Sequence, residues 1–127
     1  AAVADFAPLS FYPGKIKKSK ENENFSIPLK RTVDILHSVG REKKANQILV
    51  GFALESSDEL ENAWKKLKRK NCDIIVLNSA NKENSGFQGD LNTITILKKN
   101  GTQKSFPTFS KEKCAQIIFK EILAGDF

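Results

Sequence analysis

The pattern of hydrophobic and polar positions predicts alternating strands and helices in the middle of the chain. Residues 47–54 and 73–78 are apolar over most of their length, which is typical of strands buried in a sheet. Between them, apolar residues recur at helical spacing. This helix is expected to start at a capping box of Ser56 and Glu59 and to end near Asn71. Together these elements indicate an α/β layered domain with a mainly parallel sheet.

The first thirty residues carry a weaker pattern. Residues 1–5 are apolar as far as Asp5 and are expected to form a short buried strand. Residues 15–18 and 25–27 each alternate, and the polar run between them predicts the turn of a β-ribbon. Such an arm has little apolar surface of its own, so it is expected to pack on another body, a second subunit being the natural candidate.

Two further helices are expected outside the central block. Helical spacing in residues 33–39 predicts a short helix, with Thr32 as its N-cap and Gly40 as its stop. Ser110 is expected to cap the last helix. The apolar residues of that helix gather near one face: Cys114, Ile117, Ile118 and Ile122.

A hairpin is expected between the central block and the last helix. Residues 81–90 read as a glycine-containing loop, and 92–97 alternate as a half-exposed strand would. Asn100 and Gly101 are a strong turn signal, so residues 103–106 should return antiparallel. The carboxyl end is therefore predicted to add a hairpin and a helix to the sheet.

Composition bounds the class of protein. The chain has 127 residues, of which 39% are hydrophobic and 28% are charged, so a single domain over 1–127 is expected. No apolar run approaches the roughly 18 residues of a membrane span, and no signal-peptide pattern occurs, so the cytoplasm is the simplest location. A net charge of +6 suits an anionic partner: a nucleotide, a phosphorylated metabolite, nucleic acid or a membrane surface.

Cysteine and histidine usage argues against two classes of site. Cys72 and Cys114 are far apart and have no neighbouring cysteine, so two reduced, partly buried thiols are expected rather than a metal knuckle. His37 is the only histidine and has no evident serine, cysteine or ligand partner in the sequence. A catalytic triad and a zinc site are therefore not expected.

Polar and aromatic residues follow the predicted buried strands. Asp5, the segment 52–55 and Asn78 come at the carboxyl ends of three strands, where open α/β sheets bind ligands. The Phe52 ring could stack on a nucleotide base while the acid and the amide read its edge. The plainer alternative is that Phe52 belongs to the core and that Asp5 and Asn78 cap loops.

Two lysines suit a phosphate, although the sequence has no phosphate loop. Lys66 and Lys70 are four residues apart at the border of the helix's apolar face, where ammonium groups can neutralise phosphate oxygens. The alternative is a solvated helix end that the helix dipole favours. Neither a Walker loop nor G-x-G-x-x-G occurs. Any such loop must lie in other sequence, so the chain is expected to be a fragment that lacks a preceding region.

An ordered series of short motifs runs through the chain. The series comprises AAVADF (1–6), KIKK (15–18), DIL (34–36), VGFALE (50–55), DIIV (73–76) and GF (86–87). In this order the motifs resemble the synthetase domain of bacterial coenzyme A biosynthesis proteins, the phosphopantothenate–cysteine ligases of the DNA/pantothenate metabolism flavoprotein family. The resemblance covers nearly the whole chain.

The resemblance implies a fold and an activity. The fold would be a Rossmann-like three-layer α/β domain with a β-ribbon dimerisation arm at 15–29. The activity would be ligation of cysteine to 4′-phosphopantothenate through an acyl-cytidylate, with CTP and Mg²⁺. In many bacteria this domain follows a flavin-dependent decarboxylase domain, so FMN is implied only if such a domain is attached upstream.

The resemblance also implies site residues, with Lys15 as the catalytic lysine on a mobile lid. The nucleotide-binding set would be Ala1, Asp5, Lys15, Val33, Asp34, Ile35, Leu36, Phe52, Lys66 and Lys70. The family usually has proline at the position of Val33. The asparagine that handles the acyl intermediate, and the phosphate loop, would belong to the region before Ala1. No metal ligand can be named.

Three alternatives stay open at this point. ATP could replace CTP, as it does in some branches of the family. The chain could be a non-catalytic nucleotide-binding and dimerisation fragment. It could also bind nucleic acid through the basic stretches 15–20 and 65–70, although these lack interleaved aromatic residues and a binding motif.

Overall fold

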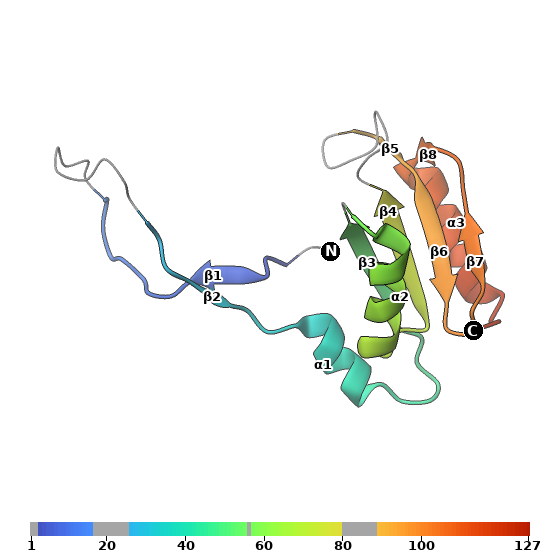
Figure 1. Ribbon diagram of the computed structural model, residues 1–127, viewed down its shortest axis with the longest axis horizontal. Helices are drawn as coiled ribbons and strands as arrows, with labels where there is room; N and C mark the ends of the chain where they lie inside the picture. The colour runs from blue at the N-terminus through green and yellow to red at the C-terminus, as the bar shows by residue number, and fades with distance from the viewer. Residues whose placement is uncertain (1–2, 17–25, 56, 80–88) are drawn as a thin grey trace. The chain divides into compact units, whose positions relative to one another are not determined.

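The computed structural model describes residues 3–16, 26–55, 57–79 and 89–127. The chain divides into two compact units, 1–35 and 36–127, which are considered separately. Figure 1 labels the elements. In chain order these are β1 (Phe6–Pro8), β2 (Leu29–Arg31), α1 (Ile35–Glu42), β3 (Val50–Glu55), α2 (Glu59–Arg69), β4 (Ile74–Ser79), β5 (Leu91–Asn92), β6 (Ile94–Lys98), β7 (Gln103–Ser105), β8 (Phe109–Ser110) and α3 (Lys111–Leu123).

The second unit is built on a four-stranded sheet in the order β3-β4-β6-β7. β3 and β4 are parallel, with α2 as the crossover between them, whereas β4–β6 and β6–β7 are antiparallel. The prediction of an α/β fold is confirmed, but the prediction of a mainly parallel sheet is wrong for the strands described. The tight turn after β6 can join only antiparallel strands, and β6 itself runs opposite to β4.

Helices cover both faces of this sheet (Figure 1). Under α2, Ala63 and Leu67 pack on Ile75 and Leu77. The opposite face is covered by α3, and its buried residues form a second cluster: Ile74, Val76, Ile94, Ile96 and Cys114. Each fully buried isoleucine or leucine contributes roughly 1.5–3 kcal/mol. The layered arrangement that the pattern predicted is therefore present in this unit.

β6 is more buried than its sequence pattern indicated. Ile94, Ile96, Leu97 and Lys98 are all at most 2% exposed, whereas a half-exposed strand was expected. The reason is that β6 lies between β4 and β7 and both of its faces are covered. The alternation of residues along one strand does not show whether a helix from a distant part of the chain covers its second face.

Lys98 is a buried charge with a full set of partners. Its ammonium group forms ion pairs with Glu121, at 2.8 Å, and with Asp126. Burial disfavours the ammonium form, but hydrogen bonds to Asp126 and Glu121 outweigh this effect and raise the pKa of Lys98. Hydrogen bonds from Lys104 and Lys98 lower the pKa of Glu121, and the hydrogen bond from Lys98 lowers that of Asp126. These contacts tie the carboxyl terminus to the sheet.

α1 begins later than expected and runs through Gly40. Thr32 does not cap it: the Thr32 hydroxyl donates to the carbonyl of Ala4 at 2.7 Å. Gly40 is required for close packing, because a Cβ there would lie 1.9 Å from the backbone carbonyl oxygen of Lys70. The side-chain Nδ2 of Asn71 donates to the Gly40 carbonyl at 2.8 Å. The prediction that Gly40 stops the helix is therefore wrong.

Two other predicted helix ends, at Asn71 and Ser110, agree with the structure. Ser110 caps α3, its hydroxyl accepting from the Lys113 amide at 3.2 Å. Asn71 follows the end of α2 in the left-handed region, with φ 52°, as a residue after a helix often does. The N-cap of α2 is Asp58, whose side chain makes no capping hydrogen bond. Ser56, half of the predicted capping box, lies outside the described residues.

The predicted hairpin at Asn100 and Gly101 is confirmed. The Gly101 amide donates to the Lys98 carbonyl at 3.0 Å, and the Lys98 amide donates to the Thr102 carbonyl at 2.9 Å. Gly101 has φ +92°, a conformation that favours glycine. β7 then returns along β6 as expected. Most of the loop predicted at 81–90 lies outside the described residues.

The first unit contains a short antiparallel ribbon, in which Phe6 pairs with Arg31 and Pro8 with Leu29. Its position corrects two predictions. Residues 3–5 are exposed and are not in a strand, and neither are the described parts of 15–18 and 25–27. Pro13 and Gly14 interrupt the first arm, which favours pairing nearer to the chain's start. Residues 1–2 and 17–25 lie outside the described part.

The ribbon exposes many large apolar side chains. Phe11 is 89% exposed, and Phe6, Leu9, Tyr12 and Leu29 are each more than half exposed. A two-stranded ribbon of this kind has no core of its own and is marginal in water. Separately, none of the described helices has the length and apolar character that crossing a bilayer requires.

Candidate functional site

β3 carries two exposed apolar side chains, at its third and fifth residues. Phe52 is 60% exposed and Leu54 is 45% exposed, whereas the alternating residues Gly51 and Ala53 are buried. Phe52 pairs with Val76, which belongs to the face that α3 covers. β3 is at the edge of the sheet, and α3 packs over β4 and β6 instead. The interpretation of Phe52 as a core residue is thereby excluded.

Asn78 lies near the carboxyl end of β4 and pairs with Leu54 on one side and with Ile94 on the other. Its side-chain oxygen Oδ1 is shielded from solvent and accepts no hydrogen bond in the described part of the chain, and the same is true of Asn92. The sequence pattern had indicated Asn78 as a possible ligand-binding residue, whereas Asn92 belonged only to the motif series and had no predicted site role. Nothing in the local pattern marks Asn92, which sits on the two-residue strand β5 beside β8.

Lys66 lies in the last turn of α2 and Lys70 directly follows the helix, on the face of the sheet opposite to Phe52. Lys70 is only 7% exposed and follows Ala63 and Leu67 on the face that packs on the sheet. The interpretation of a fully solvated helix end therefore does not fit Lys70. Phe52 faces away from α2, so a ligand that touched all three residues would have to reach around the edge strand β3.

The remaining candidate residues divide between the two units. Asp5, Lys15 and Val33 are exposed in the first unit, as are Asp34 and Ile35. The Asp5 carbonyl accepts from the Thr32 amide at 2.9 Å, which ties Asp5 into the ribbon. Leu36 belongs to the second unit and packs, partly buried, against the core under α2. Ala1 lies outside the described residues.

The two thiols are structural in this fold. Cys72 and Cys114 are free and buried. Burial raises the pKa of both, and the nearby Asp73 raises that of Cys72 further. A thiol that is protonated and shielded is a poor nucleophile, which agrees with the expectation from the sequence. Within the residues described, no three or more His, Cys, Asp and Glu side chains gather where they could hold a metal ion.

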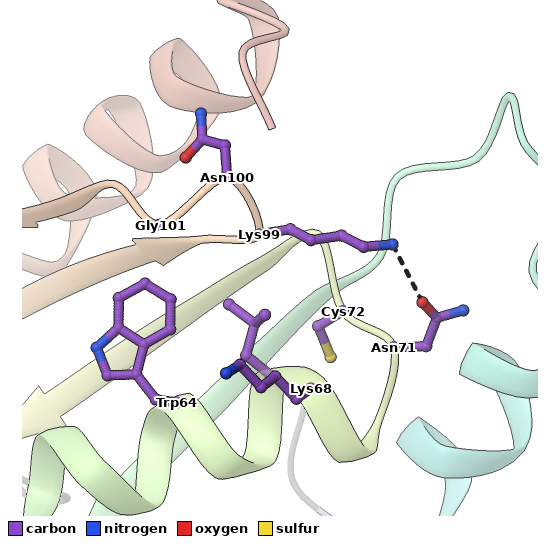
Figure 2. Close-up of a pocket in the computed structure, with 8 residues that line it drawn as sticks. Trp64, Lys68, Asn71, Cys72, Lys99, Asn100 and Gly101 are labelled. Atoms are coloured by element: carbon purple, nitrogen blue, oxygen red, sulfur yellow. Dashed lines mark hydrogen bonds between the residues drawn. The ribbon is translucent and has the colours of Figure 1, made fainter.

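An open hollow of about 600 Å³ lies at the end of the sheet opposite to Asn78, between the end of α2 and the β6–β7 turn (Figure 2). It is lined by Trp64, Lys68, Cys72, Asn71 and Lys99, among others. Lys99 donates to the Asn71 side chain at 3.3 Å, so part of its charge is already engaged. The hollow is at the amino ends of β3 and β4, away from the end at which α/β sheets bind ligands.

Comparison with known proteins decides the family. Residues 1–125 match the model of the DNA/pantothenate metabolism flavoprotein C-terminal domain. The chain belongs to this family. The expectation from the sequence motifs is thereby confirmed. The site residues that the motifs implied stay predictions, because the match extends to the domain and not to the role of any residue.

Two relatives of the DNA/pantothenate metabolism family illustrate the likeness. The chain is 45% identical over 98% of its length to the coenzyme A biosynthesis bifunctional protein CoaBC of Bacillus subtilis (strain 168), and covers 30% of that protein. It is 46% identical over 97% of its length to a protein named cysteine/cysteine sulfinic acid decarboxylase, from an unknown prokaryotic organism, and covers 34% of it. The chain thus spans about a third of these relatives.

Solved structures of the family agree with the fold. The crystal structure of the C-terminal domain of a CoaBC protein matches 96% of this chain with a TM-score of 0.70 and 35% identity, and the chain covers 50% of it. The DNA/pantothenate metabolism flavoprotein from Streptococcus pneumoniae matches 97% of the chain with a TM-score of 0.71. At 22% identity the second likeness supports the fold alone, and the chain covers 60% of that structure.

Proposed function

We propose that this chain is the carboxy-terminal part of a phosphopantothenate–cysteine ligase of coenzyme A biosynthesis. The observation that carries the proposal is the 45% identity to the Bacillus subtilis CoaBC protein over 98% of the chain. The decarboxylase name of the other relative does not compete directly, because the chain covers only 34% of that protein. An activity named for the whole relative can reside in the remainder.

The proposed reaction has two steps. A carboxylate oxygen of 4′-phosphopantothenate attacks the α-phosphorus of CTP, forming an acyl-cytidylate and releasing pyrophosphate. The amine of cysteine then attacks the acyl carbon, loses a proton and displaces CMP, which leaves an amide. Negative charge develops on phosphate oxygens in the first step, and cations stabilise it. Lys15 is proposed as the catalytic cation, and Lys66 and Lys70 as further phosphate-binding residues.

A magnesium ion is proposed to arrive with the nucleotide. The described residues offer no cluster of three or more ligands, so a dedicated protein cage for the ion does not fit. Mg²⁺ is commonly held by substrate phosphates and one or two carboxylates, and Asp5 is a suitable exposed carboxylate. The ion would neutralise the triphosphate and polarise its α-phosphorus.

Phe52 is proposed to stack on the base, and residues 33–36 are separately proposed as nucleotide-binding residues. In support of this, Phe52 is 60% exposed on a strand in which the alternating residues Gly51 and Ala53 are buried. An exposed aromatic ring on a rigid strand can stack on a base at little entropic cost. CTP is the proposed nucleotide and ATP the alternative, since both bases present a flat aromatic face.

Two protein partners are proposed. The arm at 15–29 is proposed to form a homodimer, and the exposed Phe6, Leu9 and Phe11 of its unit support a partner that covers them. A flavin-dependent decarboxylase is proposed as a fused or associated enzyme, which would bring FMN only through that second domain. The share of CoaBC that this chain leaves uncovered supports this, as does the word bifunctional in that protein's name.

The test is a coupled assay for pyrophosphate release with 4′-phosphopantothenate, cysteine, CTP and Mg²⁺. Lys15→Gln is expected to slow turnover at least 100-fold while leaving the melting temperature unchanged, because Lys15 is exposed. Phe52→Ala is expected to weaken nucleotide binding about tenfold. Lys65→Gln is the matched control, because Lys65 is exposed and pairs with Glu61 on the surface of α2.

A second candidate function is separable by the same assay. If the chain binds CTP but releases no pyrophosphate, it is a nucleotide-binding and dimerisation fragment whose catalytic partners lie elsewhere. If it binds neither nucleotide but binds random DNA with a steep salt dependence, the basic stretches carry a nucleic-acid function instead.

A further inference from the structure

Three side chains, the exposed Phe52 and Leu54 and the half-buried Asn78, project from one face of the sheet. Phe52 and Leu54 alternate on β3, and Asn78 on β4 is the register partner of Leu54. Since Phe52 pairs with Val76, two residues before Asn78, all three project from the face to which Val76 belongs. Phe52 and Asn78 are therefore diagonal neighbours across adjacent strands, within reach of one planar ligand.

The side chain of Asn78 carries a hydrogen-bond acceptor that has no donor among the described residues. Its Oδ1 is shielded from water, yet no donor in the described part of the chain reaches it. Buried polar atoms in native proteins nearly always have a partner, so an exception needs an explanation. The residue as a whole is only half-buried, and the terminal torsion of asparagine is soft, so a small rotation brings the amide to the surface of the strip.

The combination of an exposed ring and an idle amide has a specific chemistry. The face of Phe52 suits a flat heteroaromatic ring, and the Asn78 oxygen requires an N–H donor at that ring's edge. Cytosine and adenine present an exocyclic amine beside an accepting ring nitrogen, whereas uracil and hypoxanthine present a carbonyl oxygen beside a ring N–H. An Oδ1 that faces the exocyclic position therefore accepts from the amine but meets an oxygen in uracil and hypoxanthine. Asparagine is well suited to such an edge, because its amide can accept from the amine and donate to the adjacent ring nitrogen.

We propose that Asn78 selects an amino-bearing base that stacks on Phe52. This inference rests on the proposed nucleotide-dependent function and names the class of base. Asn78 touches the base and not the reacting phosphorus, so it is a specificity-determining residue. Asn92 serves as the comparison, because its Oδ1 is equally without a donor among the described residues but lies on β5, which has no register with β3 or β4.

The experiment is calorimetric titration of the 127-residue chain, and of any longer natural polypeptide that contains it, with CTP and with UTP in the presence of Mg²⁺. These nucleotides differ at C4 and in the protonation of the adjacent ring nitrogen. ATP and ITP, which differ in the same way at C6, form the second pair and distinguish cytosine from adenine as the preferred base. Wild-type protein is expected to bind the amino-bearing member of its preferred pair at least tenfold more tightly.

Three variants sharpen the titration. Asn78→Leu removes the acceptor while keeping the volume, and is expected to bring the affinity ratio of the pair to between 1 and about 2. Asn78→Asp keeps an acceptor, and is expected to retain the preference for the amine even if its overall affinity falls. Asn92→Leu is expected to retain the wild-type ratio. A merely structural role for Asn78 would lower the affinity for both nucleotides equally and leave the ratio unchanged.

The outcomes separate this inference from the proposed function. If Asn78→Leu binds with the wild-type ratio, or if wild type does not discriminate within either pair, base selection by Asn78 is overturned and the ligase proposal stands. If wild type binds none of the four nucleotides, the nucleotide-dependent function fails, and the inference fails with it.

Discussion

The two ends of the parallel pair β3–β4 differ in how they use their polar groups. At the amino end, the side chains of Asp73 and Asn71 hold the fold. Asp73 accepts from Lys43 and from the Leu49 amide, each at 2.7 Å, and Asn71 donates to Gly40. At the carboxyl end, Asn78 and Asn92 each present a shielded oxygen that no described donor reaches.

This difference indicates which polar groups stabilise the fold and which are available to bind a ligand. A satisfied network is rigid and costly to disturb, whereas an unsatisfied group is tolerated only where another molecule can complete it or where the loss is small. Mutation of the hydrogen-bonded groups at the amino end should therefore change stability. The carboxyl end should respond through binding.

The largest effect is expected from Lys98→Ala at the amino end. The substitution removes a fully buried ammonium group and leaves two carboxylates without it. Breaking one partner of a buried ion pair costs about 3–5 kcal/mol, which urea denaturation measures directly. Lys104→Ala is the control, since Lys104 also pairs with Glu121 but its side chain is 43% exposed, and about 0–1 kcal/mol is expected there. Equal losses in the two variants would mean that burial of Lys98 is not what matters.

A somewhat smaller effect is expected from Gly40→Ala. The added carbon would lie 1.9 Å from the Lys70 carbonyl oxygen, a backbone atom that can move only by shifting α1 or α2. We expect a loss of about 2–3 kcal/mol in the free energy of unfolding, as for other overpacked sites. Gly14→Ala makes a matched control, because its added carbon would meet only the Tyr12 ring, at 3.7 Å. Thermal melts of the two variants would coincide if the contact at Gly40 relaxes freely.

Acid should weaken the same end of the sheet. The folded-state pKa values of Glu121 and Asp126 lie below their ordinary values of 4.5 and 3.8. A carboxylate whose pKa is lowered by folding contributes stability that is present above its ordinary pKa and is lost as the pH falls through the folded-state pKa. The difference in unfolding free energy between wild type and Lys98→Ala should therefore narrow between about pH 5 and pH 3. A difference that stays constant over this range would show that the carboxylates do not couple to Lys98.

The sequence predicted the elements whose signals are local. The apolar runs located β3 and β4, the Asn100–Gly101 turn located the hairpin, and Ser110 was rightly assigned as the cap of α3. The direction of β6 could not be read from its own residues, because direction depends on how the chain returns to the sheet. The burial of Lys98 was equally hidden, since its partners follow 23 and 28 residues later.

The candidate site divides in the same way. Phe52 and Asn78 were predicted as site residues from the sequence, because they come near the ends of two apolar runs and α/β sheets bind ligands at the carboxyl ends of their strands. The exposure of Phe52 could not be predicted, since it depends on how far α3 extends across the sheet. The roles of Lys15 and residues 33–36 came from the family resemblance, and that of Asp5 from the resemblance and a predicted strand end. Residues 3–5 are not in a strand, and all of these roles stay predictions.

The smallest effect on stability is expected from Asn78→Leu at the carboxyl end. Its Oδ1 makes no hydrogen bond within the described residues, so the fold loses no contact of that atom and sheds an unsatisfied polar group. The free energy of unfolding should stay within about 1 kcal/mol of wild type, while the selectivity of nucleotide binding changes. A loss of more than about 2 kcal/mol would place Asn78 with the structural groups of the amino end. The contrast between the two ends therefore depends on Asn78→Leu changing nucleotide binding without changing stability. Substitutions of Lys98, Gly40 and Asp73 are expected to change stability alone.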